Sequence, residues 1–356
     1  MNKKQFLRLT AFLLCVAAIL VIMCDLFEYP NSHMSERFKT FEDFDKDTVD
    51  AVYIGTSGVD RFWLAGKAFE DYGMAVYPLT LDALPSWAVT NIIEEGITKQ
   101  NPQLVIIDVR SFCWNPGKYP SVAEKRSRRA IDQLGLFSIN RLKLINKASQ
   151  LLHEIDPEYS RFNLTFYMPF IKYHTMWSDD TFTFGEIGRK GSKTLGFRGQ
   201  HINSVKIAPQ ELPFDTDEME KLDEYSERYF EETISYIKEH NLNVLFVASP
   251  KSNNESEAKR FNYMFDRLEK EGIKYINFNS RDNLEKYKFD YSSDLYDESH
   301  VNIYGAIKYT DYFSAYLSEN YDFPDHRGDS KYEEWTGPYE YILAKVEKWE
   351  KAKENN

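Results

Sequence analysis

An α/β fold with a mostly parallel sheet is the class that the sequence predicts. Three short apolar runs, at residues 50–56, 73–77 and 104–109, are continuous rather than alternating. Continuous runs are typical of strands that are buried on both faces of a parallel sheet. Helix-like patterns separate the runs, which favours right-handed β-α-β units. Two further runs, at residues 243–248 and 273–278, complete an expected five-stranded sheet.

Helices are expected between these strands. Pro78 is expected to end the second strand, and Pro85 suits the first turn of the helix that follows. Asp215, with Glu218 three residues later, is a suitable N-cap for a long amphipathic helix. The expected helices cover residues 61–71, 85–98, 126–153, 216–241, 255–271 and 301–319.

Two regions depart from this alternation within a predicted domain of residues 50–322. Residues 113–210 interrupt it, and we expect them to form an insertion that shapes the substrate site. The aromatic-rich stretch 173–177 in this insertion is expected to pack on the sheet. Residues 323–356 are rich in charge and are expected to form a surface tail.

The N-terminus predicts a membrane anchor. Residues 6–23 are an apolar run of about 18 residues, or roughly 27 Å as a helix, which suffices to span a bilayer core. Lys3, Lys4 and Arg8 precede or flank the run, which predicts a cytoplasmic N-terminus and an extracytoplasmic main domain. We therefore expect residues 1–26 to be a cytoplasmic tip and a single-pass signal anchor in the cell membrane. A cleaved signal peptide is the alternative, although no Ala-x-Ala site follows. Residues 27–49 are expected to be a polar juxtamembrane linker.

Composition limits the class of partner. The net charge of −12 argues against nucleic acid or an anionic membrane surface as the target. An anionic polymer would have to be bound by local basic residues. Of the three cysteines, Cys15 and Cys24 lie in the apolar segment, so Cys113 has no partner for a disulfide within the soluble part. There is no zinc-ligand spacing, and we expect neither a metal nor a cofactor.

Candidate catalytic residues lie at two places far apart in the chain. Ser57 lies in a turn directly after the first strand. Asp297 and His300 lie three residues apart directly before the closing helix. A carboxylate can fix the tautomer of a histidine that acts as a general base, and such a base needs a nucleophile. The order Ser, Asp, His is one of those in which serine triads occur.

The motifs together resemble the SGNH/GDSL hydrolase superfamily. The matching segments are Gly55-Thr56-Ser57, Asp108-Val109-Arg110 and the block Asp297-x-x-His300-x-Asn302-x-x-Gly305. With the anchor, the chain is similar to a membrane-anchored extracytoplasmic branch that includes the alginate O-acetylation proteins and the D-alanyl transfer protein of teichoic-acid operons. The resemblance covers roughly residues 50–320. It implies a three-layer α/β/α, flavodoxin-like SGNH fold.

The resemblance also implies catalytic roles. Ser57 matches the nucleophile, His300 the base and Asp297 the orienting carboxylate of an acyl transfer to or from a carbohydrate hydroxyl. Gly58, Ala83 and Arg110 are the candidates for the oxyanion hole or for substrate contacts.

Two positions depart from the family pattern. The glycine that usually donates an N–H after the second strand is missing, so Ala83 or Thr80 is expected to donate instead. The asparagine expected after the third strand is also missing, and Arg110 stands near its place as an oxyanion or substrate contact or as a salt-bridge partner of an acid. Asp108 is expected to be structural and to accept loop N–H bonds. Losing one oxyanion donor costs roughly 2.7–4 kcal/mol, which leaves room for a slow enzyme or one that has lost its activity.

The implied function is that of a membrane-anchored serine O-acyltransferase that modifies a cell-surface or secreted polysaccharide or a teichoic acid. Its implied partner is a multi-spanning membrane-bound O-acyltransferase. An O-acetyl esterase of the same fold is an alternative, because only the acceptor differs. A catalytically retired domain that binds the polymer is another.

Overall fold

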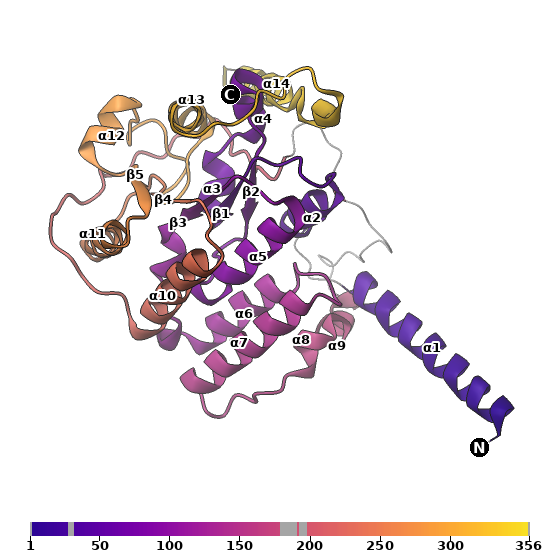
Figure 1. The fold of residues 1–356 in the computed structure, drawn as a ribbon. Coiled ribbons are helices and arrows are strands. Elements are labelled where there is room, and N and C mark those ends of the chain that lie inside the picture. Colours follow the sequence, from indigo (N-terminus) through magenta and orange to yellow (C-terminus); the bar gives the residue numbers. More distant parts are fainter. Residues whose placement is uncertain (1, 28–31, 179–190, 192–197, 355–356) are drawn as a thin grey trace.

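Five parallel strands form a single sheet. The computed structural model describes residues 2–27, 32–178, 191 and 198–354, so parts of the expected linker and insertion lie outside the described residues. The strand order is β2-β1-β3-β4-β5, and all pairs are parallel (Figure 1). The predicted α/β class and five parallel strands are thereby confirmed. The strands are β1 (Ala51–Gly55), β2 (Val76–Thr80), β3 (Leu104–Asp108), β4 (Val244–Ala248) and β5 (Lys274–Asn277).

The strand order places the chemistry. The chain leaves β1 for β2 on one side and then crosses to β3 on the other side. In open α/β sheets of this order, ligands bind beyond the carboxyl ends of the strands where the direction reverses. Here that point lies between β1 and β3, which pair from Ala51 with Leu104 to Ile54 with Ile107.

Helices and short 3₁₀ turns connect the strands and follow the sheet. The bounds are α3 (Ser57–Phe62), α4 (Ala65–Tyr72), η1 (Ser86–Ala88), α5 (Val89–Gln100), η2 (Val109–Phe112), η3 (Pro116–Lys118), α6 (Pro120–Ile131), α7 (Ile139–Ile155), α8 (Leu164–Tyr167), α9 (Pro169–Tyr173), η4 (His174–Ser178), α10 (Glu224–Glu239), α11 (Glu255–Lys270), α12 (Arg281–Lys286) and α13 (Ile303–Asn320).

Several expected boundaries differ for local reasons. Pro78 lies inside β2 rather than after it, because β2 is an edge strand, where a residue without an N–H is tolerated. The expected helix 126–153 is two helices, α6 and α7, since the Arg141 guanidinium binds the Leu134 carbonyl at 3.0 Å in the turn between them. The N-cap of α10 is Asp223 and not Asp215; its carboxylate accepts from the amides of the first turn.

The expected polar linker belongs largely to the folded body. It contains α2 (Ser32–Asp43), which packs on β2. Met34, Phe38 and Phe41 are buried on one face of α2. The fully buried Arg37 forms an ion pair with Asp60. The apolar spacing of i, i+4 and i+7 is that of a helix face, and the charged residues around it concealed the pattern.

The expected surface tail also packs on the core. It contains η5 (Ser330–Trp335) and α14 (Pro338–Glu354). Trp335 is buried, with its ring stacked 5.7 Å from that of Phe69. His326 binds Asp50, next to the start of β1, at 2.9 Å. Charge dominates the composition of this segment, but its aromatic side chains decide where it packs.

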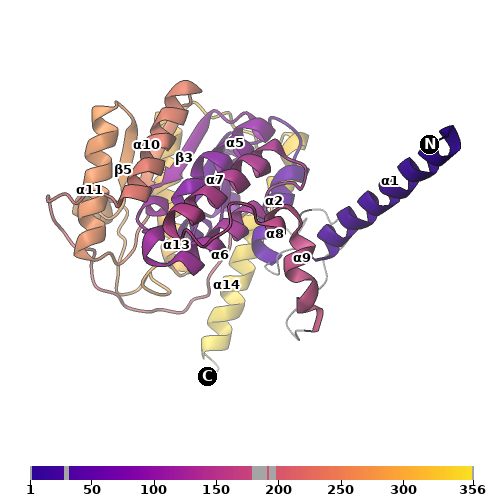
Figure 2. The same cartoon turned by 90° about the horizontal axis from the view of Figure 1, so that it is seen from below.

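The first helix, α1 (Lys3–Leu26), extends away from the body (Figures 1 and 2). It has 24 residues, and a window of 18 of them has a mean hydropathy of 2.6, so it is long and apolar enough to cross a membrane; a signal sequence meets the same criterion. The stretch 173–177 was expected to pack on the sheet, but it lies in and after α9, which packs against α1. Tyr173 is buried there, while Trp177 is 66% exposed.

The buried tail can be tested with two tryptophans. Trp335→Ala should lower the free energy of unfolding by about 3–5 kcal/mol, because it leaves a large cavity beside Phe69 and Phe44. Trp177→Ala removes the same side chain from an exposed position and should change it by about 0.5 kcal/mol or less. Denaturant unfolding of the full chain measures both. Equal effects of the two substitutions would contradict the packing of the tail.

Candidate active site

Ser57 lies at the turn from β1 into α3. Thr56 is the N-cap of α3, and its hydroxyl accepts from the Gly58 amide at 3.4 Å. A side chain at Gly55 would collide with Asp108 on β3 and with Val59. A glycine is therefore required where the turn that carries Ser57 passes close to β3.

The loop that carries Asp297 and His300 is held by the other residues of its motif. The Asn302 side chain caps α13, where it accepts from the amides of Tyr304 at 3.0 Å and Gly305 at 3.1 Å. Its amide group donates to the Ser293 carbonyl at 2.7 Å. A Cβ at Gly305 would collide with the backbone of Asp294. Asn302 and Gly305 thus shape the loop.

Helix α13 brings this loop to Ser57. The hydroxyl groups of Tyr309 on α13 and Tyr53 on β1 form a buried hydrogen bond of 2.8 Å. Thr310 accepts from the Leu64 amide at 3.0 Å and donates to the Phe62 carbonyl at 3.1 Å. These bonds link α13 to the first strand and to the segment between α3 and α4.

The structure brings Ser57, His300 and Asp297 together. Ser57 Oγ lies 2.9 Å from His300 Nε2. His300 Nδ1 lies 2.9 Å from each carboxylate oxygen of Asp297. An ionised carboxylate only accepts, so Nδ1 carries the proton and Nε2 is free to accept the serine proton. The side chains of His300 and Asp297 are 22% and 42% exposed, so a substrate can reach them.

The electrostatics suit a general base. Burial lowers the pKa of His300; the Asp297 hydrogen bond opposes this, and the charges of Arg61 and Arg110 add to the lowering. Burial raises the pKa of Asp297, but the hydrogen bonds from His300 and from the Ser299 amide outweigh it and leave the pKa below its usual value. At neutral pH His300 is therefore neutral and Asp297 is ionised.

Ala83 has a backbone conformation that glycine adopts more readily than alanine. Its φ of +55° lies in the left-handed region that favours glycine. The Leu81 amide donates to the Gly55 carbonyl at 3.2 Å, which holds this loop beside the end of β1. Within the described part of the chain, no acceptor receives the Ala83 or Ser57 amides, whereas the Gly58 amide is used in the cap. Thr80 is fully buried at the end of β2. Ala83 and Ser57 are therefore better placed than Thr80 and Gly58 to donate to a substrate.

Arg110 lies beside the triad. Its guanidinium donates to Ser249 Oγ at 3.2 Å and to the Ser299 carbonyl at 3.3 Å. Among the described residues it forms no ion pair within 4.0 Å, so the expected salt bridge to an acid is not formed directly; the Ser249 hydroxyl links the guanidinium to the Asp108 carboxylate. A Cβ at Gly58 would meet the end of the Arg110 side chain, so a larger residue there would displace the guanidinium. Burial raises the pKa of Asp108 and the Arg110 charge opposes that rise, so this buried carboxyl is an acid on which the guanidinium acts.

Asp108 has the structural role that the sequence predicted. It is fully buried, and its carboxylate accepts from the Arg110 amide at 2.9 Å and from the Ser249 hydroxyl.

Sequence reasoning missed three residues of this site. Arg61, one turn after Ser57, donates to the Ser57 carbonyl at 2.9 Å. Its i, i+4 spacing is a signal that the sequence contained. The His201 amide donates to the carbonyl of Asp60, the residue before Arg61, at 2.6 Å, and burial lowers the pKa of His201 to about 4. Ser249 follows β4 and joins Arg110 to Asp108. Only the fold reveals these last two.

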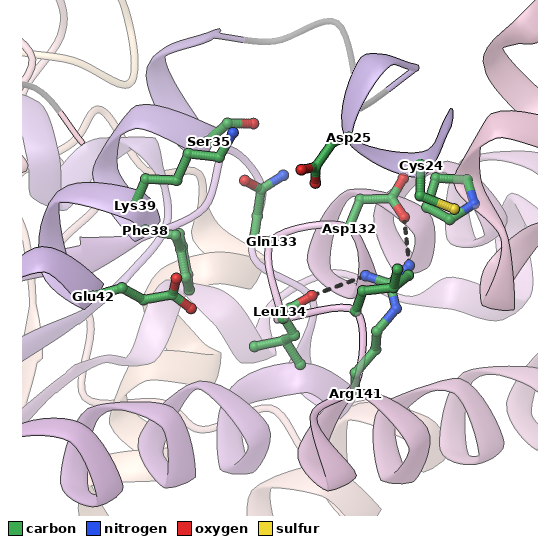
Figure 3. Close-up of a pocket in the computed structure, with 13 residues that line it drawn as sticks. Cys24, Asp25, Ser35, Phe38, Lys39, Glu42, Asp132, Gln133, Leu134 and Arg141 are labelled. Carbon is green, nitrogen blue, oxygen red and sulfur yellow. Dashed lines mark hydrogen bonds and ion pairs between the residues drawn. The ribbon is translucent and has the colours of Figure 1, made fainter. Parts of the chain in front are cut away.

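A separate cavity of about 260 Å³ lies away from the triad (Figure 3). Its lining comes from the end of α1, from α2 and from the turn between α6 and α7. Arg141 binds Asp132 at 3.2 Å in its wall. None of the predicted site residues lines it. Among the described residues, no cluster of His, Cys, Asp and Glu could hold a metal ion.

The Asp297 charge can be tested through the pH dependence of Ser57. Asp297→Asn removes the group that supports protonated His300, so the pKa of His300 should fall further and the acidic limb of Ser57 reactivity should move to lower pH. The plateau should fall by about 10²–10⁴-fold, because the amide no longer fixes the tautomer. The rate of Ser57 labelling by a fluorophosphonate, followed from acidic to neutral pH, measures both. A limb that moves to higher pH would contradict this assignment.

Removing the Arg110 charge should shift the acidic limb of Ser57 reactivity in the direction opposite to that of Asp297→Asn. Arg110→Met removes a charge that lowers the pKa of His300, so the acidic limb should move to higher pH. The plateau rate of Ser57 labelling should fall by about 10²–10³-fold, because the guanidinium no longer stabilises the oxyanion. Arg110→Lys keeps the charge, and the same labelling assay should find its limb near the wild-type position. Identical limbs in both variants would show that the Arg110 charge does not act on His300.

No protein-family model matches the chain, and no curated protein is significantly similar to it. The resemblance to the SGNH/GDSL superfamily therefore stays a prediction that rests on the motifs.

Proposed function

We propose that the chain is a membrane-anchored extracytoplasmic serine O-acyltransferase. One observation carries the proposal: Ser57, His300 and Asp297 form a continuous hydrogen-bonded relay with distances of 2.9 Å. A neutral histidine between a serine and an ionised carboxylate is the arrangement that activates a serine for acyl transfer.

The proposed reaction has two halves. His300 Nε2 takes the Ser57 proton as Oγ attacks the acyl carbonyl, and Asp297 stabilises the imidazolium that forms. The amides of Ser57 and Ala83, together with the Arg110 guanidinium, are the donors available to the oxyanion. His300 then protonates the leaving group, and an acyl-Ser57 ester remains. In the second half His300 activates a sugar hydroxyl, which takes the acyl group and frees Ser57.

The fold supports this assignment. The strand order β2-β1-β3-β4-β5 is that of flavodoxin-like sheets, and Ser57 lies at their usual ligand position. We propose that the body is a three-layer α/β/α domain of the SGNH type. The block Asp297-x-x-His300-x-Asn302-x-x-Gly305 supports this further. Its Asn302 caps α13, and its Gly305 leaves room for the Asp294 backbone.

The proposed setting is the cell membrane. We propose that α1 stays as a single-pass anchor with a cytoplasmic N-terminus, which the basic residues Lys3 and Lys4 support. A multi-spanning membrane-bound O-acyltransferase is the proposed source of acyl groups, and a polysaccharide or teichoic acid the acceptor. An esterase of the same fold would use the same triad with water as acceptor.

Covalent labelling tests the nucleophile. In native membranes the full chain should react with a fluorophosphonate at Ser57, as peptide mapping would show. Ser57→Ala and His300→Ala should abolish labelling. Ser299→Ala removes a hydroxyl from the same loop and should leave it unchanged. A folded chain that takes no label in membranes would support a retired, polymer-binding domain instead.

The acceptor distinguishes transferase from esterase. The membranes should be offered an acyl donor with bare polymer and, separately, acetylated polymer. Acylation of the bare polymer that depends on Ser57 is the expected result. Release of acetate alone would favour the esterase.

A further inference from the structure

Exposed apolar side chains gather around the C-terminal end of α1. They come from the turn between α6 and α7 with the first residue of α7, and from the segment that runs from just before α8 to η4; each is between 36% and 78% exposed. We call them the apolar rim: Phe137, Ile139, Phe162, Leu164, Tyr167 and Trp177.

The structure places these segments together. Helix α9 packs against α1, and α8 packs against α9 and α7. The cavity in Figure 3 is lined by Cys24 at the end of α1, by Pro169 of α9 and by residues 132–136 next to Phe137. Figures 1 and 2 both show α8 and α9 beside the end of α1 where the body begins. The rim is therefore one region around the exit of this helix.

The length of α1 sets the level of the rim. Its 24 residues span about 36 Å, against roughly 30 Å for the hydrocarbon core of a bilayer. Its last turn, with Cys24, then lies at the membrane surface, and α9 lies beside that turn. This step rests on the proposed anchor.

The chemistry of the rim suits the interfacial layer. Tryptophan and tyrosine are enriched at that level, where the ring is buried and the polar atom stays hydrated. The cavity wall next to the rim carries the exposed carboxylates of Asp25 and Glu42, which have to stay in the hydrated headgroup layer, whereas the side chain of Asp132 is buried and paired with Arg141. The aromatic side chains limit how far the rim can lie from the bilayer, and the carboxylates limit how deeply it can enter. With a net charge of −12, apolar contact rather than attraction to anionic lipid would hold the rim.

We propose that the apolar rim lies in the interface of the bilayer that α1 spans. The body is then attached to the membrane at two places, the anchor and the rim. Two attachments restrict rotation of the body about α1, so the triad keeps a constant direction relative to the membrane.

Quenching by lipid tests the placement. The full chain would be reconstituted into phosphatidylcholine vesicles whose acyl chains are brominated near the headgroup. The Trp177 contribution is the fluorescence lost in Trp177→Phe, and more than half of it should be quenched. Two reporters are built in the Trp177→Phe background: Phe12→Trp in the middle of α1, and Phe214→Trp, which is 45% exposed on the side near α11, far from α1. The reporter at 12 should be quenched by lipid that is brominated deeper in its acyl chains, and the reporter at 214 should not be quenched.

The three positions separate the outcomes. The placement of the rim would be overturned if the reporter at 12 is quenched but Trp177 is quenched no more than the reporter at 214. The anchor would then still stand. No quenching at 12 would overturn both. A Trp177 signal shielded from bromine and from aqueous iodide would mean that a protein covers the rim, which also overturns the proposal. None of these results depends on Ser57, so the proposed chemistry stands or falls separately.

Discussion

The buried hydrogen bond between Tyr53 and Tyr309 is the contact on which the site depends. It joins the first strand to the last helix of the sheet domain across 256 residues of sequence. Burial raises the pKa of both phenols well above its usual value, so both stay protonated and one donates to the other. Thr310, one residue along α13, bonds to the turn after α3. Ser57 and His300 meet because these polar groups can be satisfied in the core only when α13 lies in one register.

The sequence predicted the sheet well because each strand is a continuous apolar run, a signal that needs no knowledge of neighbours. It missed the roles of α2 and of the C-terminal segment for the opposite reason. Arg37 and Trp335 are buried only because distant parts of the chain cover them: the Thr80 and Gly199 carbonyls accept from Arg37, and Phe44 and Phe69 stack on Trp335. The sequence around a charged residue or an isolated aromatic residue in a polar segment does not indicate that distant residues will bury it.

The residues of the site also fall into those that local sequence could predict and those that only the fold reveals. Ser57, Asp297 and His300 could be predicted because each lies in a short motif whose other residues have local duties, such as the cap made by Asn302. Arg61 left a weaker signal, its spacing of one turn from Ser57. Ser249 and His201 left none, since they reach the site from separate segments through the order of the strands and the path of the chain.

Ala83 lies in a strained backbone conformation in the loop that follows β2. A residue with a side chain in the left-handed region costs roughly 1–2 kcal/mol, so this loop keeps an unfavourable backbone that a glycine would adopt freely. Such strain persists where the surrounding structure enforces it, here through the Leu81 bond to Gly55 and the ion pairs of Asp82 with His33 and Arg61. The loop therefore holds the Ala83 amide, which has no acceptor among the described residues, in a conformation that a glycine would adopt more readily.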